Sequence, residues 1–216
     1  MPSKFKCEFR SWENIYTLSR IVARKIRESN WEPDAIIGIT RGGWVPARNL
    51  CDFLGVKDLF GVKIEHWGVT ATPDGEAKLK WPLNVDLSGK KVLVVDDIID
   101  TGESMLIAIE HIKTLNPKEI RTAALFYIKG SKFIPDYFAE EIEWKWIIFP
   151  WNVTEDLINL ISNFLKEREI VEISEVIDGL KDWYDIELTE QQLKEVLEEM
   201  RIRKIIKVDG NKITKL

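Results

Sequence analysis

The sequence predicts an α/β protein with a mostly parallel sheet flanked by helices, followed by a small helical C-terminal domain. Short apolar runs alternate with amphipathic helical segments up to about residue 150. Turns that contain glycine follow the runs Ala35–Ile39 and Val92–Val95. After Pro150, helical segments dominate. Strands that alternate with helices indicate βαβ units and a parallel sheet.

The elements of the first part follow from hydrophobic periodicity. A helix is expected from residue 12 to about residue 28, because Ile15, Leu18, Val22 and Ile26 share one helical face. Further helices are predicted over residues 45–54 and 104–115, and strands over 35–39, 60–65, 92–95, 121–128 and 146–149. Residues 68–90 contain Gly, Pro, Asp and several Lys, which predicts a long mobile loop.

The last third predicts three helices and a terminal hairpin. The helices are expected over residues 154–167, 174–183 and 189–205, and the third begins with the capping box Thr189–Gln192. Its apolar stripe, Leu193, Val196, Leu197 and Met200, needs a partner. A turn at Asp209-Gly210 would close the hairpin. We therefore divide the chain into a core domain, residues 1–152, and a helical domain, residues 153–216.

Composition excludes several classes of protein. With 45% apolar and 31% charged residues, the 216-residue chain is expected to be a soluble globular protein. No apolar run approaches the ~18 residues of a membrane helix, and no signal peptide is recognised at the start. Two Cys and two His cannot build a disulfide framework and leave little for a zinc site or a Ser-His-Asp triad. The expected compartment is a reducing cytoplasm.

The segment Val92–Ser104, VLVVDDIIDTGES, carries the most chemical information. Turn amides and a helix N-terminus hold phosphate well, and Thr101 and Ser104 add hydroxyl groups. Gly102 allows close approach of the backbone to a phosphate. Asp96 and Asp97 are placed to bind a vicinal diol and a hydrated magnesium ion. The alternative is a buried strand that ends in solvated acids before a helix cap.

This segment resembles the signature of the type I phosphoribosyltransferases, which bind 5-phosphoribosyl pyrophosphate (PRPP). The resemblance implies that Asp96 and Asp97 hold the ribose hydroxyls and help to place Mg²⁺. It also implies that the 5-phosphate is wrapped by the turn Asp100, Thr101, Gly102, Glu103 and Ser104. Asp100 would contact the purine imidazole and assist removal of its proton, as the catalytic residue.

Two more segments resemble the purine enzymes of that family. Ile36–Ala47, IIGITRGGWVPA, is similar to their pyrophosphate loop, with Thr40, Arg41 and Gly42 at the binding positions. Trp146–Trp151, WIIFPW, is similar to their base-binding segment, in which Trp146 stacks on the purine and the Ile147 backbone meets its edge. Lys129 aligns with a lysine that donates to a purine 6-oxo group. Structural roles, as a turn, a core aromatic and a surface lysine, remain the alternatives.

The base is less well defined than PRPP. The family often has Lys-Pro-Trp-Ser where this chain has Lys129-Gly130-Ser131, and a carboxylate where this chain has Asn152. A divergent adenine branch resembles this scaffold and has a helical C-terminal third. We therefore expect a purine phosphoribosyltransferase, with adenine slightly favoured and AMP as its product, and hypoxanthine or guanine as the alternative. The loop 68–90, with Lys78 and Lys80, would close over the site.

The resemblance also implies partners, namely PRPP, a purine base and a second copy of the chain in a homodimer. The rival class is a PRPP-sensing regulator that binds nucleic acid through a C-terminal winged helix. Residues 201–216 have six Lys or Arg against one acid, but residues 166–216 have ten basic and thirteen acidic residues. Together with a net charge of −5, this acidic balance disfavours binding to nucleic acid.

Overall fold

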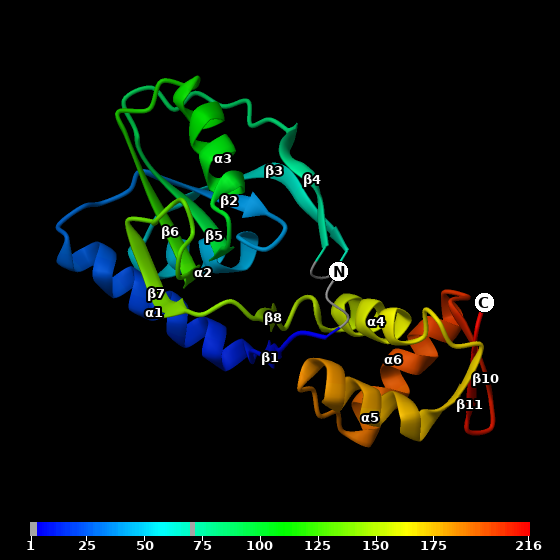
Figure 1. The fold of residues 1–216 in the computed structure, drawn as a ribbon. Coiled ribbons are helices and arrows are strands. Elements are labelled where there is room, and N and C mark those ends of the chain that lie inside the picture. The colour runs from blue at the N-terminus through cyan, green and yellow to red at the C-terminus, as the bar shows by residue number, and fades with distance from the viewer. Residues whose placement is uncertain (1–3, 70–71) are drawn as a thin grey trace. The chain divides into compact units, whose positions relative to one another are not determined.

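A computed structural model describes residues 4–69 and 72–216 of the chain (Figure 1). The chain forms two compact units. The core unit contains Trp12–Gly68 and Pro73–Trp144. The C-terminal unit contains Lys145–Leu216 together with the N-terminal residues up to Ser11. The sequence divides the chain after Asn152, whereas residues 145–152 here belong to the C-terminal unit. The domain division after Asn152 stays a prediction.

A six-stranded sheet with the order β4-β3-β2-β5-β6-β7 forms the centre of the core unit. Its strands are β2 (Ala35–Thr40), β3 (Asp58–Val69), β4 (Thr72–Trp81), β5 (Lys91–Ile99), β6 (Glu119–Ile128) and β7 (Tyr137–Ile142). The pairs β2–β3, β2–β5, β5–β6 and β6–β7 are all parallel. The expected mostly parallel sheet is confirmed.

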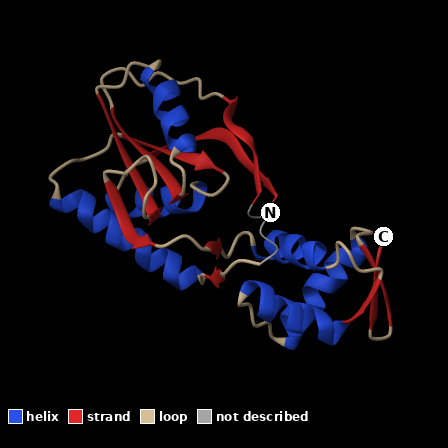
Figure 2. Cartoon of the chain, in the orientation of Figure 1, coloured by secondary structure: helices blue, strands red, loops and turns tan. Residues whose placement is uncertain are grey.

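Helices cover both faces of this sheet (Figure 2). They are α1 (Trp12–Glu28), α2 (Trp44–Leu54) and α3 (Glu103–Lys113). On one face, Met105, Ala108 and Ile112 of α3 pack in one buried cluster with strand residues that include Ile37, Val92 and Val94. On the other face lie α1 and α2, where the predicted stripe of α1 is buried. The helices thus cover the two faces of the sheet and not the carboxyl ends of its strands, where ligands bind in such folds.

The prediction of a long mobile loop over residues 68–90 is wrong for most of its first half. There β3 runs on to Val69, and β4 occupies Thr72–Trp81 beside it. Ala77 and Leu79 pack in the core cluster, whereas Lys78 and Lys80 are exposed. Lys80 lies 3.5 Å from Glu65 of β3. The charged composition concealed the period-two alternation of a strand.

The C-terminal unit contains more sheet than the sequence indicated. Its elements are β1 (Cys7–Phe9), β8 (Trp146–Ile148), α4 (Val153–Phe164), β9 (Ile170–Glu172), α5 (Ile173–Tyr184), α6 (Glu190–Ile202), β10 (Ile206–Asp209) and β11 (Lys212–Lys215). The capping box at Thr189 is present, and the hairpin turns at Gly210. The strand order β10-β11-β9, with α5 and α6 between β9 and β10, is that of a winged helix.

One hydrophobic core holds the C-terminal unit together. The stripe Leu193, Val196, Leu197 and Met200 is buried there, as its spacing required. Ile148 of β8 and Cys7 of β1 are in the same cluster as α4, α5 and α6, and Trp146 packs against it. The last of the expected strands, at Trp146, therefore lies outside the central sheet and pairs in parallel with β1. Strand β1 was not predicted, because three residues are too few to show the alternation of a strand.

Candidate active site

The order of the strands makes β2 and β5 the switch point of the sheet. From β2 the chain continues to β3 on one side and then crosses to β5 on the other, so the direction of winding reverses at this pair. Pairing between β2 and β5 ends at Gly38 and Val95, although both strands continue. In open α/β sheets, ligands bind at such a switch point, beyond the carboxyl ends of the strands.

Asp96 and Asp97 lie at this divergence, inside β5, which extends to Ile99 rather than ending before the acids. The N–H of Asp97 donates to Oδ1 of Asp96 at 3.0 Å, and the N–H of Ile98 donates to Oδ1 of Asp97 at 2.9 Å. Asp96 is buried and Asp97 is half-buried. These backbone contacts orient two adjacent carboxyl groups where β2 and β5 diverge.

The glycine loop after β2 packs directly on this pair. A Cβ on Gly42 would overlap the Asp97 carboxyl group. A Cβ on Gly43 would overlap the carbonyl oxygen of Val95 and lie 2.9 Å from Cα of Asp96. The hydroxyl of Thr40 donates to the Val62 carbonyl at 3.2 Å, and Arg41 is exposed. The structure thus brings the predicted pyrophosphate loop and the predicted diol-binding acids together.

The two carboxyl groups are costly to ionise together. Burial raises the pKa of Asp97 to about 6. Burial, followed by the charge of Asp97, raises the pKa of Asp96 well above its usual range. A divalent cation beside them would offset both effects, and carboxylate oxygens are the ligands that Mg²⁺ prefers. The side chains therefore fit Mg²⁺.

Protein side chains alone do not surround such an ion. Among the residues whose side chains the structure describes, no three of His, Cys, Asp or Glu form a metal-binding cluster. Mg²⁺ usually keeps several waters and takes one or two carboxylates together with phosphate oxygens of a substrate. A shared site of this kind suits the pair Asp96 and Asp97.

The turn after β5 forms the N-terminus of α3. Asp100 follows Ile99, and Gly102 adopts φ +86°, a left-handed conformation that favours glycine. The N–H of Glu103 donates to the Thr101 hydroxyl at 3.3 Å, and Glu103 and Ser104 form the first turn of α3. The backbone N–H groups of a first helical turn attract anions. The predicted phosphate-binding residues are thus gathered in one turn.

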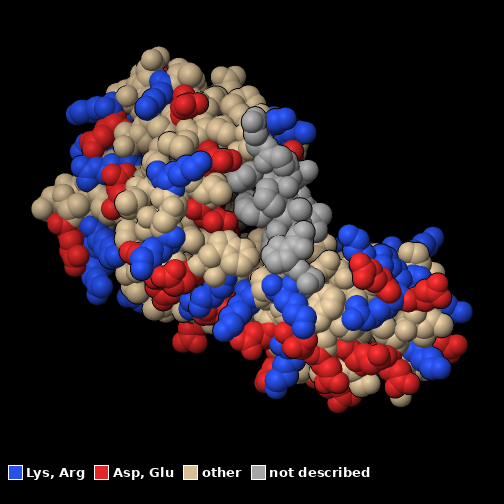
Figure 3. All heavy atoms as spheres, in the orientation of Figure 1, with Lys and Arg blue, Asp and Glu red and all other residues tan. Residues whose placement is uncertain are grey.

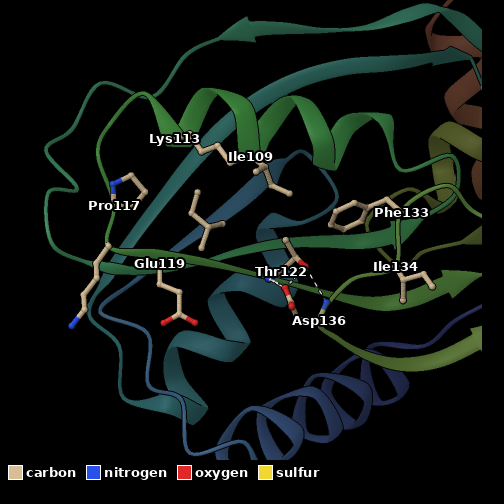
Figure 4. A pocket seen from close by; sticks show the side chains of 10 residues that line it. Ile109, Lys113, Pro117, Glu119, Thr122, Phe133, Ile134 and Asp136 are labelled. Carbon is tan, nitrogen blue, oxygen red and sulfur yellow. Dashed lines mark hydrogen bonds between the residues drawn. The ribbon is translucent and has the colours of Figure 1, made fainter.

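Phe133 supports this turn, a role that the sequence did not reveal. A Cβ on Gly102 would overlap Cβ of Phe133 and lie 3.2 Å from its backbone N. The loop that carries Phe133 is fixed by Asp136, whose Oδ2 accepts from the Thr122 N–H at 2.8 Å and from its hydroxyl at 2.7 Å (Figure 4). The sequence around Phe133 has no feature that indicates this role, which is apparent only from the contact with Gly102.

Phe133 also lines a cavity of about 470 Å³ between α3, the start of β6 and this loop (Figure 4). Its walls mix apolar residues such as Ile109 and Ile134 with the charged residues Lys113 and Glu119. None of the predicted PRPP-binding or pyrophosphate-binding residues lines it. We assign it no role in the reaction.

Lys129 lies directly after β6, where its N–H donates to the Ile142 carbonyl at 2.9 Å. Its ammonium group is exposed, 3.3 Å from Glu143. This contact agrees with the alternative of a surface lysine. Its contact with a purine stays a prediction.

Trp146 and Ile147 belong to the C-terminal unit, and their contact with a purine also stays a prediction. The backbone N–H of Trp146 donates to the Lys6 carbonyl at 3.0 Å, and its indole N–H donates to Oδ1 of Asp156 at 3.1 Å. Ile147 is buried. The segment is therefore held by β1 on one side and by the first turn of α4.

One of the two histidines, His111, has a structural role. Nε2 of His111 accepts from the Leu83 N–H at 2.9 Å, which agrees with that role. The side chain of His66 lies outside the residues whose burial the structure describes.

No helix in the described ranges is long and apolar enough to cross a membrane.

Comparison with known proteins agrees with this geometry. The phosphoribosyl transferase domain family matches residues 8–156. A xanthine-guanine phosphoribosyltransferase of Cereibacter sphaeroides is 30% identical over 150 residues, 66% of this chain and 85% of that protein. Xanthine phosphoribosyltransferase 1 of Saccharomyces cerevisiae is 28% identical, over 67% of this chain and 89% of that protein.

Among solved structures, a purine phosphoribosyltransferase from Pyrococcus horikoshii matches with a TM-score of 0.59 and 34% identity. The match covers 68% of this chain and 94% of that one. The family match ends in the first turn of α4, at residue 156, so most of the winged-helix region lies beyond it.

Proposed function

Because the chain belongs to the phosphoribosyltransferase family, we propose that it transfers the 5-phosphoribosyl group of PRPP to a purine base, giving a purine mononucleotide and pyrophosphate. The observation that carries this proposal is the packing at the switch point between β2 and β5. There Asp97 lies against Gly42, Asp96 lies against Gly43, and the turn with the proposed phosphate-binding residues follows β5 directly. The names of the relatives also support a purine as acceptor.

In the proposed reaction, a ring nitrogen of the purine forms a bond to the anomeric carbon while the bond from that carbon to pyrophosphate breaks. The ring proton passes to Asp100, acting as the general base. The turn Asp100–Ser104 fixes the 5-phosphate, so that the anomeric carbon is presented in line with both groups. Arg41 and the amides near Gly42 stabilise the charge that grows on pyrophosphate.

Asp96 and Asp97 hold the ribose hydroxyls in this scheme and would hold Mg²⁺. When bound, Mg²⁺ supplies electrostatic stabilisation of the leaving pyrophosphate. The carboxyl groups themselves orient the diol, because their own backbone contacts fix their direction. Trp146 serves as the surface on which the base stacks.

The acceptor is proposed to be a 6-oxopurine. The relatives named above are xanthine-guanine, xanthine and purine enzymes, and none is named for adenine. The preference for adenine expected from the sequence rested on the helical C-terminal third, and it is the competing prediction that the assay below decides. Lys129 suits a 6-oxo group, because an ammonium donates hydrogen bonds and cannot accept them.

A direct assay tests the proposal. PRPP and Mg²⁺ are offered with adenine, hypoxanthine, guanine or xanthine, and nucleotide and pyrophosphate are measured. We expect stoichiometric formation of both with at least one 6-oxopurine. No nucleotide from any of the four bases would contradict the proposed function. AMP formation alone would replace the 6-oxopurine assignment with adenine.

The winged-helix order of the last elements favours one second candidate, a regulator that binds nucleic acid. The exposed charges oppose it. In α6, Lys194 and Arg201 pair with Glu190 and Glu198, and Glu195 adds a further acid. Figure 3 shows acidic and basic side chains interspersed over the C-terminal unit, with no continuous basic surface on the face displayed. Binding of duplex DNA with a steep salt dependence would favour the regulator.

A further inference from the structure

The side chain of Asp156 makes an unusual contact for a buried acid. It lies in the first turn of α4 and is only 3% exposed. Its Oδ1 accepts the indole N–H of Trp146 at 3.1 Å. Burying a carboxyl group costs free energy unless hydrogen bonds compensate for the lost water. The hydrogen bond to the indole of Trp146 compensates for part of this cost.

The contact restricts the side-chain torsions that strand pairing leaves open in Trp146. Pairing of Trp146 with Cys7 in the β1–β8 ladder fixes its backbone. The indole could still rotate about its side-chain torsions. The hydrogen bond to Asp156 and the packing against the C-terminal core restrict these torsions. The plane of the ring is thereby set by a residue of α4.

Other contacts anchor Asp156 itself. The backbone N–H of Asp156 donates to the Asn152 carbonyl at 2.9 Å, at the start of α4. An acidic group is favoured in the first turn of a helix. Burial raises the pKa of the nearby Cys7 thiol to about 12, and the charge of Asp156 adds to that shift. The backbone of the residue that accepts the indole N–H is therefore fixed at the start of α4.

We propose that Asp156 is a positioning residue for the purine: by holding the indole of Trp146 it presets the plane on which the base stacks. The inference rests on the proposed function, because Trp146 is the proposed stacking surface. It also gives the C-terminal third a role, since α4 belongs to the same core as α5 and α6. A preset ring lowers the entropy lost when the base binds.

The kinetic test compares three substitutions. Asp156→Leu removes the acceptor at similar volume, and Asp156→Asn retains an acceptor oxygen. Asn163→Leu is the matched control, because Asn163 donates to the Tyr184 hydroxyl at 2.7 Å near the other end of α4, away from Trp146. We expect Asp156→Leu to raise KM for the purine about 10-fold, the scale of one lost hydrogen bond to a charged group, with KM for PRPP unchanged. Asp156→Asn and Asn163→Leu should leave both constants within about twofold.

A double-mutant cycle separates positioning from general damage. Trp146→Phe keeps an aromatic ring without the N–H, so adding Asp156→Leu to it should change KM for the purine no further. Equal KM shifts in Asp156→Leu and Asn163→Leu would overturn the inference, since both would then report loss of stability. An additive cycle, or an unchanged KM in Asp156→Leu, would overturn it as well.

A second readout does not depend on turnover. In protein labelled with ¹⁵N-tryptophan, the indole N–H signal absent from Trp146→Phe identifies Trp146. We expect that proton to exchange slowly with solvent in the wild type and in Asp156→Asn, and rapidly in Asp156→Leu. Rapid exchange in the wild type would contradict the inference. If no purine is turned over, the proposed function fails and the role of Asp156 fails with it, while this signal still reports the hydrogen bond.

Discussion

The residues proposed to bind PRPP and those proposed to bind the purine are held by different kinds of interaction. In the core unit, Gly42, Gly43 and Gly102 bring main chain into contact with Asp97, β5 and Phe133, leaving no room for a Cβ. In the C-terminal unit, Trp146 is held by a side-chain hydrogen bond and a shared hydrophobic core. An added side-chain atom at these glycines should therefore disturb the PRPP region, whereas the purine region should tolerate conservative substitutions.

The largest effect is expected from Asp96→Asn combined with Asp97→Asn. The change keeps the shape but removes the charge that orients Mg²⁺ and the ribose diol, so kcat/KM should fall about 10⁴-fold. Stability should not fall, because two carboxyl groups whose pKa values are raised by burial are replaced by neutral amides. Steady-state kinetics and thermal unfolding measure both quantities. Unchanged turnover in the double variant would rule out the PRPP assignment.

Asp100→Asn should reduce the rate of the chemical step about 10²–10⁴-fold, because an amide cannot take the purine proton. PRPP binding should survive, since backbone amides of the turn hold the 5-phosphate. Single-turnover kinetics and PRPP titration separate these effects. If PRPP affinity collapses while the chemical step stays normal, Asp100 is only a phosphate-binding residue.

Gly42→Ala tests whether close backbone packing defines the PRPP region. The added Cβ would overlap the Asp97 carboxyl group, and its displacement should lower kcat/KM about 10²-fold. Gly89→Ala is the matched control. Gly89 adopts φ +75° with open space around it, so alanine there should cost about 1 kcal/mol of stability with no loss of activity. Equal kinetics for the two variants would refute the packing argument.

The two thiols report on the two units without altering activity. Cys7 is buried in the C-terminal unit and Cys51 in the core unit, and burial raises the pKa of both. At neutral pH little thiolate forms, so modification should wait for each unit to open. Labelling followed by mass spectrometry should show slow reaction of both. Rapid labelling of Cys7 in the native protein would show that β1 does not pack stably in its core.

Much of the PRPP region could be predicted from the sequence, because local pattern and chemistry coincide there. The run VLVVDDIIDTGES contains the buried strand, the acids and the helix start together. Strand order then explains why Gly42, far away in sequence, meets Asp97.

The remainder depends on contacts that no local pattern encodes. The three-residue strand β1 is too short to show a period, yet it pairs with β8. In β4, frequent lysines hid the alternation that places Ala77 and Leu79 in the core. Phe133 and Asp156 acquire their roles only when Gly102 and Trp146 become their neighbours.

The claim that the two regions bind different substrates is tested most directly by initial rates over a grid of PRPP and purine concentrations. Two variants are compared, Trp146→Ala in the base segment and Ser104→Ala in the phosphate-binding turn. We predict that Trp146→Ala raises KM for the purine by at least about 10-fold, the scale of a lost stacking contact, and leaves KM for PRPP within about twofold. Ser104→Ala should show the reverse pattern. A rise of the same KM in both variants would contradict the claim that the two regions bind different substrates.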